Sequence, residues 1–422
     1  MKNVKTKLIT LVTAAAVLAG TVFAPSATAA PTYDRTPLGP FFKVSQSRIN
    51  KARNGQLLGA RYVPSPIPGT TAMQYIFRST NTFGKPILAS SAIVRPLSAL
   101  PNGHVFVYDD FVNSLGVKCQ PSFAFEAVQK TMAKFGDGAG YNDELSGRSP
   151  IFMAVAAVMA GRGVTTILPD HLGLKGSYTA NRLGAHITLD AMRAARQIKQ
   201  AMVRDSKMII AGYSGGAMVA GFSAAMQPAY APELNVVGAV MGGIPVNMEW
   251  MGKTLGNARN PAFGIVMASM LGLEREYPNR MIVTPRLSKK GKKLANRNRN
   301  ACITRILDQW ANESATTTMN NVQIRQQYRE MKVLRENSII NYPRAPKVPV
   351  YVWATDKDIF VPHRQVQGLV RKWCKTNRGL RATYMDTKGP DHMSNFGIGL
   401  PLALTWIFAR FDGLPAPNNM CK

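Results

Sequence analysis

The chain contains 422 residues, of which 52 are Lys or Arg and 23 are Asp or Glu, for a formal net charge of +29. This length is sufficient for a large hydrophobic core, built as one big domain or as one domain with an insertion. After residue 30 no stretch stays apolar long enough to span a bilayer, which excludes a protein with several membrane-spanning helices.

The first 29 residues have the three parts of a secretory signal peptide. Three lysines are followed by an apolar run from Leu8 to Phe23 and then by the small residues Ala27-Thr28-Ala29. An uncleaved membrane anchor is the alternative, but the apolar run is short for a bilayer span and a cleavage site follows it. We therefore expect cleavage after Ala29 and a secreted, extracellular protein.

The excess of positive charge remains after this segment is removed. Residues 1–29 hold three lysines and no acidic residue, so the remainder carries a formal charge of +26. Such a charge favours attraction to anionic lipid or cell-wall polymers, and so an exported chain could associate with the cell envelope. The alternative is a solvated surface that keeps the protein soluble. We expect no nucleic-acid partner and infer no obligate protein partner.

Apolar, strand-like runs alternate with helical patterns from about Ser91 to Gly243. This alternation is typical of βαβ units and predicts an α/β fold with a largely parallel sheet. The predicted strands are Val105–Tyr108, Val164–Leu168 and Lys207–Ala211, and the predicted helices are Ile151–Gly161 and Leu183–Met202.

The pattern changes between residues 247 and 344, where strand-like runs vanish and helical spacing dominates. Phe263–Leu273 is apolar and Val322–Asn337 is strongly charged, which predicts a helical cap inserted into the core. The core is then predicted to comprise residues 30–246 and 345–422. Its second part has predicted strands at Val348–Trp353 and Arg381–Met385, and predicted helices at His363–Cys374 and Leu400–Phe411.

The strongest local motif is Gly212-Tyr213-Ser214-Gly215-Gly216. It lies between the predicted strand 207–211 and a helix-forming run from Ala217 to Met226. A strand, a GxSxG turn and a helix form the nucleophile elbow of α/β-hydrolases, which exposes the serine hydroxyl. The amide of Gly215 would then face a developing oxyanion. Ser214 is thus the predicted nucleophile, with a structural turn serine as the alternative.

A serine nucleophile needs a base and an acid, which in this fold follow it along the chain. His392 lies in a turn-rich loop after the strand 381–385, where the base belongs, whereas His363 begins a predicted helix. We expect His392 to be the base and Asp391 to be a solvated neighbour. Asp356 and Asp358 both follow the strand 348–353, and position alone does not decide which is the acid.

Three histidines precede the nucleophile, namely His104, His171 and His186. Each is expected to be a packed or capping residue. Asp170-His171 follows a strand at the predicted catalytic edge, where it could support the site.

The cysteines predict disulfides. An exported chain with Cys119, Cys302, Cys374 and Cys421 is expected to form two disulfides, with three pairings open. No CxxC motif or histidine cluster accompanies them, so we expect no metal site and no cofactor.

With these residues assigned, the chain resembles the secretory lipase family typified by Candida antarctica lipase A, which belongs to the α/β-hydrolase superfamily. The similarity covers nearly the whole chain after the signal segment. It is carried by Gly212–Gly216, Tyr230–Ala239, Gly242–Val246 and Phe411-Asp412-Gly413. The resemblance implies an α/β-hydrolase core with a helical cap and the activity of a carboxylic ester hydrolase of the triacylglycerol lipase type.

The resemblance also implies specific residues. In the family the acid precedes a Val-Pro pair, here Val361-Pro362, which selects Asp358. The matching disulfides are Cys119–Cys302 and Cys374–Cys421. The second oxyanion-hole donor would be Asp110, whose carboxyl group would have to stay protonated. Alternatively, Asp109-Asp110 only caps the turn that follows.

The sequence thus predicts a secreted serine hydrolase that cleaves carboxylic esters of lipids through an acyl-enzyme. The alternatives are a cell-envelope acyltransferase with the same triad and a non-catalytic protein that binds surfaces through its charge. Apolar cap residues are expected either to line an acyl pocket or to pack the cap, namely Phe263, Ile265, Met267, Met270 and Leu271.

Overall fold

The computed structural model describes residues 32–34, 36–125, 151–320, 323 and 326–421. The predicted signal peptide lies outside the described residues, and so does Val322 at the start of the charged cap segment. Within the described residues, no helix is both long and apolar enough to cross a bilayer.

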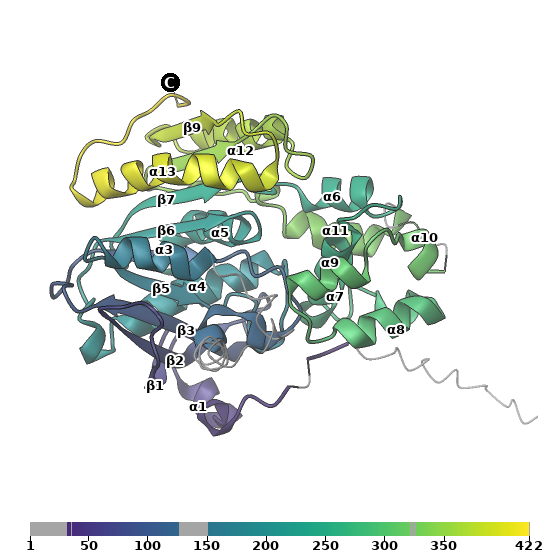
Figure 1. Ribbon diagram of the computed structural model, residues 1–422, viewed down its shortest axis with the longest axis horizontal. Coiled ribbons are helices and arrows are strands. Elements are labelled where there is room, and N and C mark those ends of the chain that lie inside the picture. The colour runs from purple at the N-terminus through teal and green to yellow at the C-terminus, as the bar shows by residue number, and fades with distance from the viewer. Residues whose placement is uncertain (1–31, 35, 126–150, 321–322, 324–325, 422) are drawn as a thin grey trace, which may run out of the picture.

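A single sheet of nine strands in the order β1-β2-β3-β5-β4-β6-β7-β8-β9 runs through the described residues (Figure 1). The pairs from β1 to β5 are antiparallel, and all pairs from β5 to β9 are parallel. The strands are β1 (Leu57–Val63), β2 (Thr70–Thr80), β3 (Pro86–Pro96), β4 (Val105–Asp109), β5 (Thr165–Pro169), β6 (Met208–Tyr213), β7 (Val236–Gly242), β8 (Val350–Ala354) and β9 (Ala382–Asp386).

The parallel half matches the sequence prediction, because strands covered on both faces need continuous apolar runs. Every residue of β4, β5, β6 and β8 is buried. The antiparallel strands β1, β2 and β3 were not predicted. Polar residues such as Gln74, Ser90 and Ser91 interrupt the apolar pattern of β2 and β3, although all three are buried.

Helices cover both faces of the sheet. One hydrophobic cluster contains residues of α4 (Asn181–Ala195), α5 (Gly215–Tyr230) and α12 (His363–Thr376). A second cluster, on the other face, contains residues of α3 (Ile151–Ala160) and α13 (His392–Phe411). These two helical layers around a mostly parallel sheet are the α/β-hydrolase arrangement predicted from the sequence.

Two helix boundaries differ from the prediction. The helix expected to reach Met202 ends at Ala195, and a 3-10 turn, Lys199–Ala201, follows it, with Met202 in the left-handed region. The last helix starts at His392 rather than Leu400. Gly397, Gly399 and Pro401 obscure its first turns in the sequence, because glycine and proline are poor helix formers.

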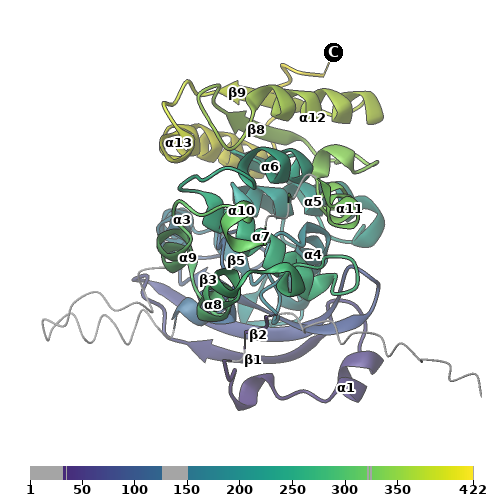
Figure 2. The same cartoon turned by 90° about the vertical axis from the view of Figure 1, so that its right-hand side faces the viewer.

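The helices between β7 and β8 gather at one side of the sheet. Figure 1 shows them in green at the right, and in Figure 2 they face the viewer. They are α6 (Met248–Leu255), α7 (Phe263–Glu276), α8 (Lys289–Asn298), α9 (Ile303–Gln309), α10 (Ala315–Thr318) and α11 (Tyr328–Glu336). We propose that residues 247–344 form the cap. Short segments also join the elements, namely η1 (Pro40–Phe42), α1 (Gln46–Lys51), η2 (Val117–Cys119), η4 (Thr284–Arg286) and η6 (Ile339–Asn341).

Two disulfides join distant parts of the chain. Cys119 is bonded to Cys302, which connects the segment after β4 with the start of α9. Cys374 is bonded to Cys421, which fastens the C-terminal segment to α12. These are the pairs that the family resemblance implies. Each closes a long loop, for which a stabilisation of about 2–4 kcal/mol is typical.

Arg275, in α7, is a buried cation bound by main-chain carbonyls from several segments. Its guanidinium group has no exposed surface, and burial lowers the pKa of Arg275 to about 10. Main-chain carbonyls on other segments accept its hydrogen bonds, namely those of Thr32, Leu115, Lys175, Gly176 and Arg299. The side chain thereby joins α7 to the N-terminal segment and to two loops of the core.

We predict that Arg275→Met lowers the free energy of unfolding by about 3–5 kcal/mol, because buried carbonyls lose their donors. Urea denaturation followed by circular dichroism measures this change. Arg378→Met is the matched control, since Arg378 is exposed after α12. Equal stability of the two variants would show that the buried hydrogen bonds contribute little.

Candidate active site

The turn at Ser214 joins the end of β6 to the start of α5. Ser214 has φ +49° and ψ −117°, a backbone conformation that non-glycine residues rarely adopt. Gly212 and Gly216 make this turn sterically feasible. A Cβ atom on Gly216 would overlap the carbonyl oxygen of Asp109, and one on Gly212 would overlap the backbone of Gly216. The geometry is that of the nucleophile elbow predicted from the sequence.

Ser214, His392 and Asp358 form a hydrogen-bonded array. His392 Nε2 lies 2.8 Å from Ser214 Oγ, and His392 Nδ1 lies 2.5 Å from Asp358 Oδ2. These partners favour the tautomer in which Nδ1–H donates to the carboxylate and Nε2 accepts from the hydroxyl. The three residues follow β6, β8 and β9, whose carboxyl ends meet at one edge of the sheet.

Asp358 and Asp356, which sequence position did not separate, have different surroundings. The Asp358 side chain is fully buried, and its Oδ1 accepts hydrogen bonds from the amides of Phe360 (2.9 Å) and Val361 (3.0 Å). Asp356 is 40% exposed and pairs with Lys388 at 3.6 Å. Only Asp358 is positioned to orient the imidazole. Of the two downstream histidines, only His392 contacts Ser214, while His363 begins α12.

The N-terminus of α13 holds His392 in place. Asp391 is the N-cap, and its Oδ1 accepts from the amides of Met393 (2.8 Å) and Ser394 (2.9 Å). The hydroxyl of Tyr213 donates to the carbonyl of His392. His392 is therefore the first residue of a helix and does not lie in an irregular loop. Asp391, expected to be only a solvated neighbour, is exposed but caps that helix.

An apolar cavity of about 820 Å³ opens in front of Ser214 and His392. Its far walls come from α6, α7 and α9, including Met248, Leu255, Ile265, Val266, Ile303 and Leu307. Ile359 and Met393 also line it and are 73% and 53% exposed. Of the five apolar cap residues singled out from the sequence, Ile265 lines the cavity. The other four are buried in the hydrophobic core, namely Phe263, Met267, Met270 and Leu271.

The side chain of Asn113 lies beside the Cα atom of Gly215, and the backbone of Asp110 lies beside Gly216. Asp110 is 2% exposed and is not among the described residues that line the cavity. Asn113 does line it, and a Cβ atom on Gly215 would overlap the Asn113 side-chain oxygen. This Oδ1 atom is buried without a hydrogen-bond partner among the described residues. Rotating the Asn113 side-chain amide by 180° would therefore break no hydrogen bond of Oδ1. It would place the NH2 group beside Gly215.

His171 supports the segment that carries Asp110 and Asn113. Its ring is buried, and Nε2 lies 2.7 Å from the carbonyl oxygen of Asp110. Burial lowers the pKa of His171 to about 4, so the ring is neutral and Nε2–H donates to that carbonyl. Within the described part of the chain, no three His, Cys, Asp or Glu side chains come together as metal ligands would.

The family model described as "Secretory lipase" matches residues 151–419, more than half of the chain. The chain belongs to the secretory lipase family. It is 26% identical to Lipase 1 of Candida albicans over 416 residues, covering 93% of this chain and 84% of the relative. It is 24% identical to Lipase A of Moesziomyces aphidis over 397 residues, covering 90% and 81%. Membership in this family identifies the chain as a lipase-type ester hydrolase.

Solved structures support the fold of this secretory lipase. Candida antarctica lipase A in its closed state superposes with a TM-score of 0.79 at 24% identity, covering 91% of this chain and 87% of that chain. A rice cell wall degrading esterase of Xanthomonas oryzae gives a TM-score of 0.64 at 16% identity, covering 86% and 98%. At these identities the likeness establishes the α/β-hydrolase fold.

We predict that the contribution of His171 to stability depends on pH. The unfolded chain protonates this imidazole below about pH 6.5, whereas the folded protein does so only below about pH 4. Between these values the unfolded state binds more protons, so the contribution of His171 to stability grows as pH rises. The difference in unfolding free energy between the lipase and its His171→Gln variant should increase by up to about 3 kcal/mol from pH 4 to pH 7.

Urea titrations of both proteins at several pH values measure this difference. Buried Asp170, whose pKa burial raises to about 6, is present in both proteins, so its opposite pH dependence cancels. A difference that stays constant with pH would contradict the prediction.

Proposed function

We propose that this lipase is a secreted serine hydrolase in which Ser214, His392 and Asp358 cleave carboxylic esters of lipids through an acyl-enzyme. The single observation that carries the proposal is the hydrogen-bonded series from Ser214 through His392 to buried Asp358 at the wall of an apolar cavity. Secretion rests on the predicted signal peptide and on the description of the family.

In the first step His392 Nε2 accepts the hydroxyl proton of Ser214 as Oγ attacks the ester carbonyl. Asp358 stabilises the imidazolium that results and holds the ring in its tautomer. When the tetrahedral intermediate collapses, His392 Nε2–H gives its proton to the departing alcohol oxygen, and the acyl group remains on Ser214. Water, activated by the same imidazole, then attacks the acyl-enzyme, releases the acid and restores the hydroxyl group.

The oxyanion would be held by the Gly215 amide and by the Asn113 side-chain amide. A donor on each side of the developing charge is the usual arrangement for acyl transfer. Asn113 supplies its NH2 group without a change of protonation, whereas the predicted role of Asp110 requires a neutral carboxylic acid. The position of Asn113 at the cavity wall beside Gly215 supports this assignment over Asp110.

The cavity supports a lipid acyl chain as the group that is bound next to Ser214. Its volume of about 820 Å³ and its methionine and aliphatic walls suit a long hydrocarbon group. Ile359 and Met393 extend the apolar surface to the mouth of the cavity. The relatives that share most of the chain are named lipases, which agrees with triacylglycerol or another lipid ester as the substrate.

Ser214→Ala should lose both ester hydrolysis and stoichiometric labelling by a fluorophosphonate, because no other hydroxyl contacts His392 Nε2 among the described residues. Mass spectrometry of the labelled protein and p-nitrophenyl ester assays measure the two effects. Ser47→Ala is the control, since Ser47 is an exposed serine of α1 that does not line the cavity.

Absence of labelling in folded wild-type protein would remove the hydrolase mechanism and favour a binding protein. Faster transfer to added alcohols or glycans than to water would instead favour the acyltransferase that the sequence left open.

Asn113→Ala should lower kcat about 10²–10³-fold with little change in KM, because a lost oxyanion donor acts on the transition state. Steady-state kinetics on a soluble ester gives both constants. Asn113→Asp should restore little activity at neutral pH, since a carboxylate repels the oxyanion. If Asn113→Ala kept the wild-type kcat and Asp110→Ala lost most of it, Asp110 would be the second oxyanion-hole donor.

A further inference from the structure

A second large cleft lies at the edge of the sheet opposite the candidate active site. Its volume is about 770 Å³, and its walls come from the end of α4, from the loop before β1 and from the turns that precede β6 and β7. Ser214 follows β6, so the length of this strand, roughly 20 Å, separates the two sites. The cleft shares no lining residue with the apolar cavity at Ser214.

The cleft is far more basic than the chain as a whole. Five of its twelve lining residues are Arg or Lys, compared with 52 of 422 in the sequence. They are Arg53, Arg193, Arg196, Lys199 and Arg204, and Glu233 is the one carboxylate among the described residues that line it. The high charge of the chain therefore does not by itself explain this concentration.

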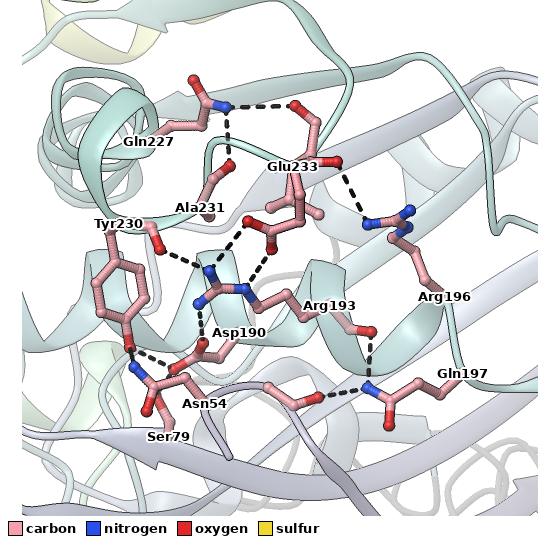
Figure 3. A network of polar contacts seen from close by, with 12 residues as sticks. Asn54, Ser79, Asp190, Arg193, Arg196, Gln197, Gln227, Tyr230, Ala231 and Glu233 are labelled. Atoms are coloured by element: carbon pink, nitrogen blue, oxygen red, sulfur yellow. Dashed lines mark hydrogen bonds and ion pairs between the residues drawn. The ribbon is translucent and has the colours of Figure 1, made fainter.

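Arg193 lies at the centre of a network of polar contacts in this wall, as Figure 3 shows. Its guanidinium lies between Glu233 (2.5 Å) and buried Asp190 (3.0 Å), and it also donates to the carbonyl of Tyr230 (2.6 Å). Gln197 fixes the neighbouring wall by donating to the carbonyl of Gly55 (2.6 Å). Because Asp190 and Glu233 already neutralise its charge, Arg193 has a structural role in the cleft.

None of the other four cations forms a close ion pair with a described carboxylate, although the charge of Arg196 contributes to lowering the pKa of Glu233. Arg196 donates only to main-chain carbonyls, those of Arg204 (2.6 Å) and Glu233 (3.4 Å). Arg53, Lys199 and Arg204 are exposed, and their side chains form no ion pair with a described residue. Several like charges around one concavity repel each other, and a multivalent anion would relieve that repulsion.

We propose that this cleft binds an anion with several phosphoryl groups, either a free phosphate chain or a segment of a phosphate-linked polymer. Arginine forks bond phosphate oxygens in pairs, and lysine adds a point charge. The volume of the cleft fits a ligand of several groups better than one inorganic ion. Its concave shape favours an inserted chain over a flat bilayer surface.

The position of the cleft determines how such a ligand would act. A polymer held there leaves the cavity of Ser214 open and turned away from the polymer. The ligand would therefore retain the enzyme on a phosphate-rich matrix without competing with the ester substrate.

Isothermal titration of the full secreted chain with tripolyphosphate tests this proposal. The Arg53→Ala/Arg204→Ala double variant should bind at least about tenfold more weakly than the wild type, because charge-assisted bonds are lost. Lys292→Ala/Lys293→Ala removes the same charge from exposed positions on α8 and should change binding less than about twofold. Equal losses in the two double variants would overturn the proposal in favour of general charge attraction.

Two further arms separate binding of a phosphate chain from binding of single phosphate ions and from binding of a lipid surface. Inorganic phosphate should bind more weakly than tripolyphosphate, and vesicles of phosphatidylglycerol in phosphatidylcholine should not distinguish the cleft variant from its control. Vesicle binding that depends on Arg53 and Arg204, without tripolyphosphate binding, would overturn the proposal and indicate a lipid surface. Saturating tripolyphosphate should leave hydrolysis of a soluble ester unchanged, and competitive inhibition would likewise contradict a separate site. Unchanged circular dichroism and ester turnover in the cleft variant establish that it is folded.

Discussion

The close approach of β4 to the turn at Ser214 is the constraint on which the rest of the site depends. Asp109, the last residue of β4, pairs with Gly212 on β6, and its carbonyl occupies the space where Gly216 would otherwise carry a side chain. Ser214 keeps its strained conformation because its amide donates to the carbonyl of Gly242 at 2.9 Å. The contact between Asp109 and Gly216 also fixes where the chain leaves β4, and therefore how far Asn113 lies from Gly215.

The parallel strands bring together site residues that are far apart in the sequence. Since the carboxyl ends of β6, β8 and β9 share one edge, the loops after them need only short extensions to meet. Burying the Asp358 carboxylate is costly in isolation, but two main-chain amides and the imidazole satisfy its oxygens. The carboxylate and the imidazole are therefore held in place without a ligand, so the proposed mechanism would need little reorganisation of these two groups.

The sequence predicts those parts of this arrangement whose signal is local. Ser214 lies in a motif with a defined strand and helix on either side, and the buried parallel strands are continuous apolar runs. Other features depend on neighbours that are remote in the chain. Asp356 and Asp358 differ in burial, which spacing does not reveal, and Asn113 gains its significance only from contact with Gly215. The start of α13 was not predicted because Gly397, Gly399 and Pro401 lower the helix propensity of its first turns. For the same reason, Asp391 was not recognised as its N-cap.

The two edges of the sheet have opposite chemical character, which the net charge of the chain conceals. At the carboxyl edge, apolar walls and the exposed side chains of Ile359 and Met393 surround the hydroxyl of Ser214. At the opposite edge, four cations that form no close ion pair with a described carboxylate surround a cleft. An apolar ligand and a multivalent anion are thus attracted to different ends of the same strands. At moderate salt, electrostatic interactions between exposed groups are largely screened beyond about 10 Å. The two sites are further apart than this, so binding at one need not alter the other.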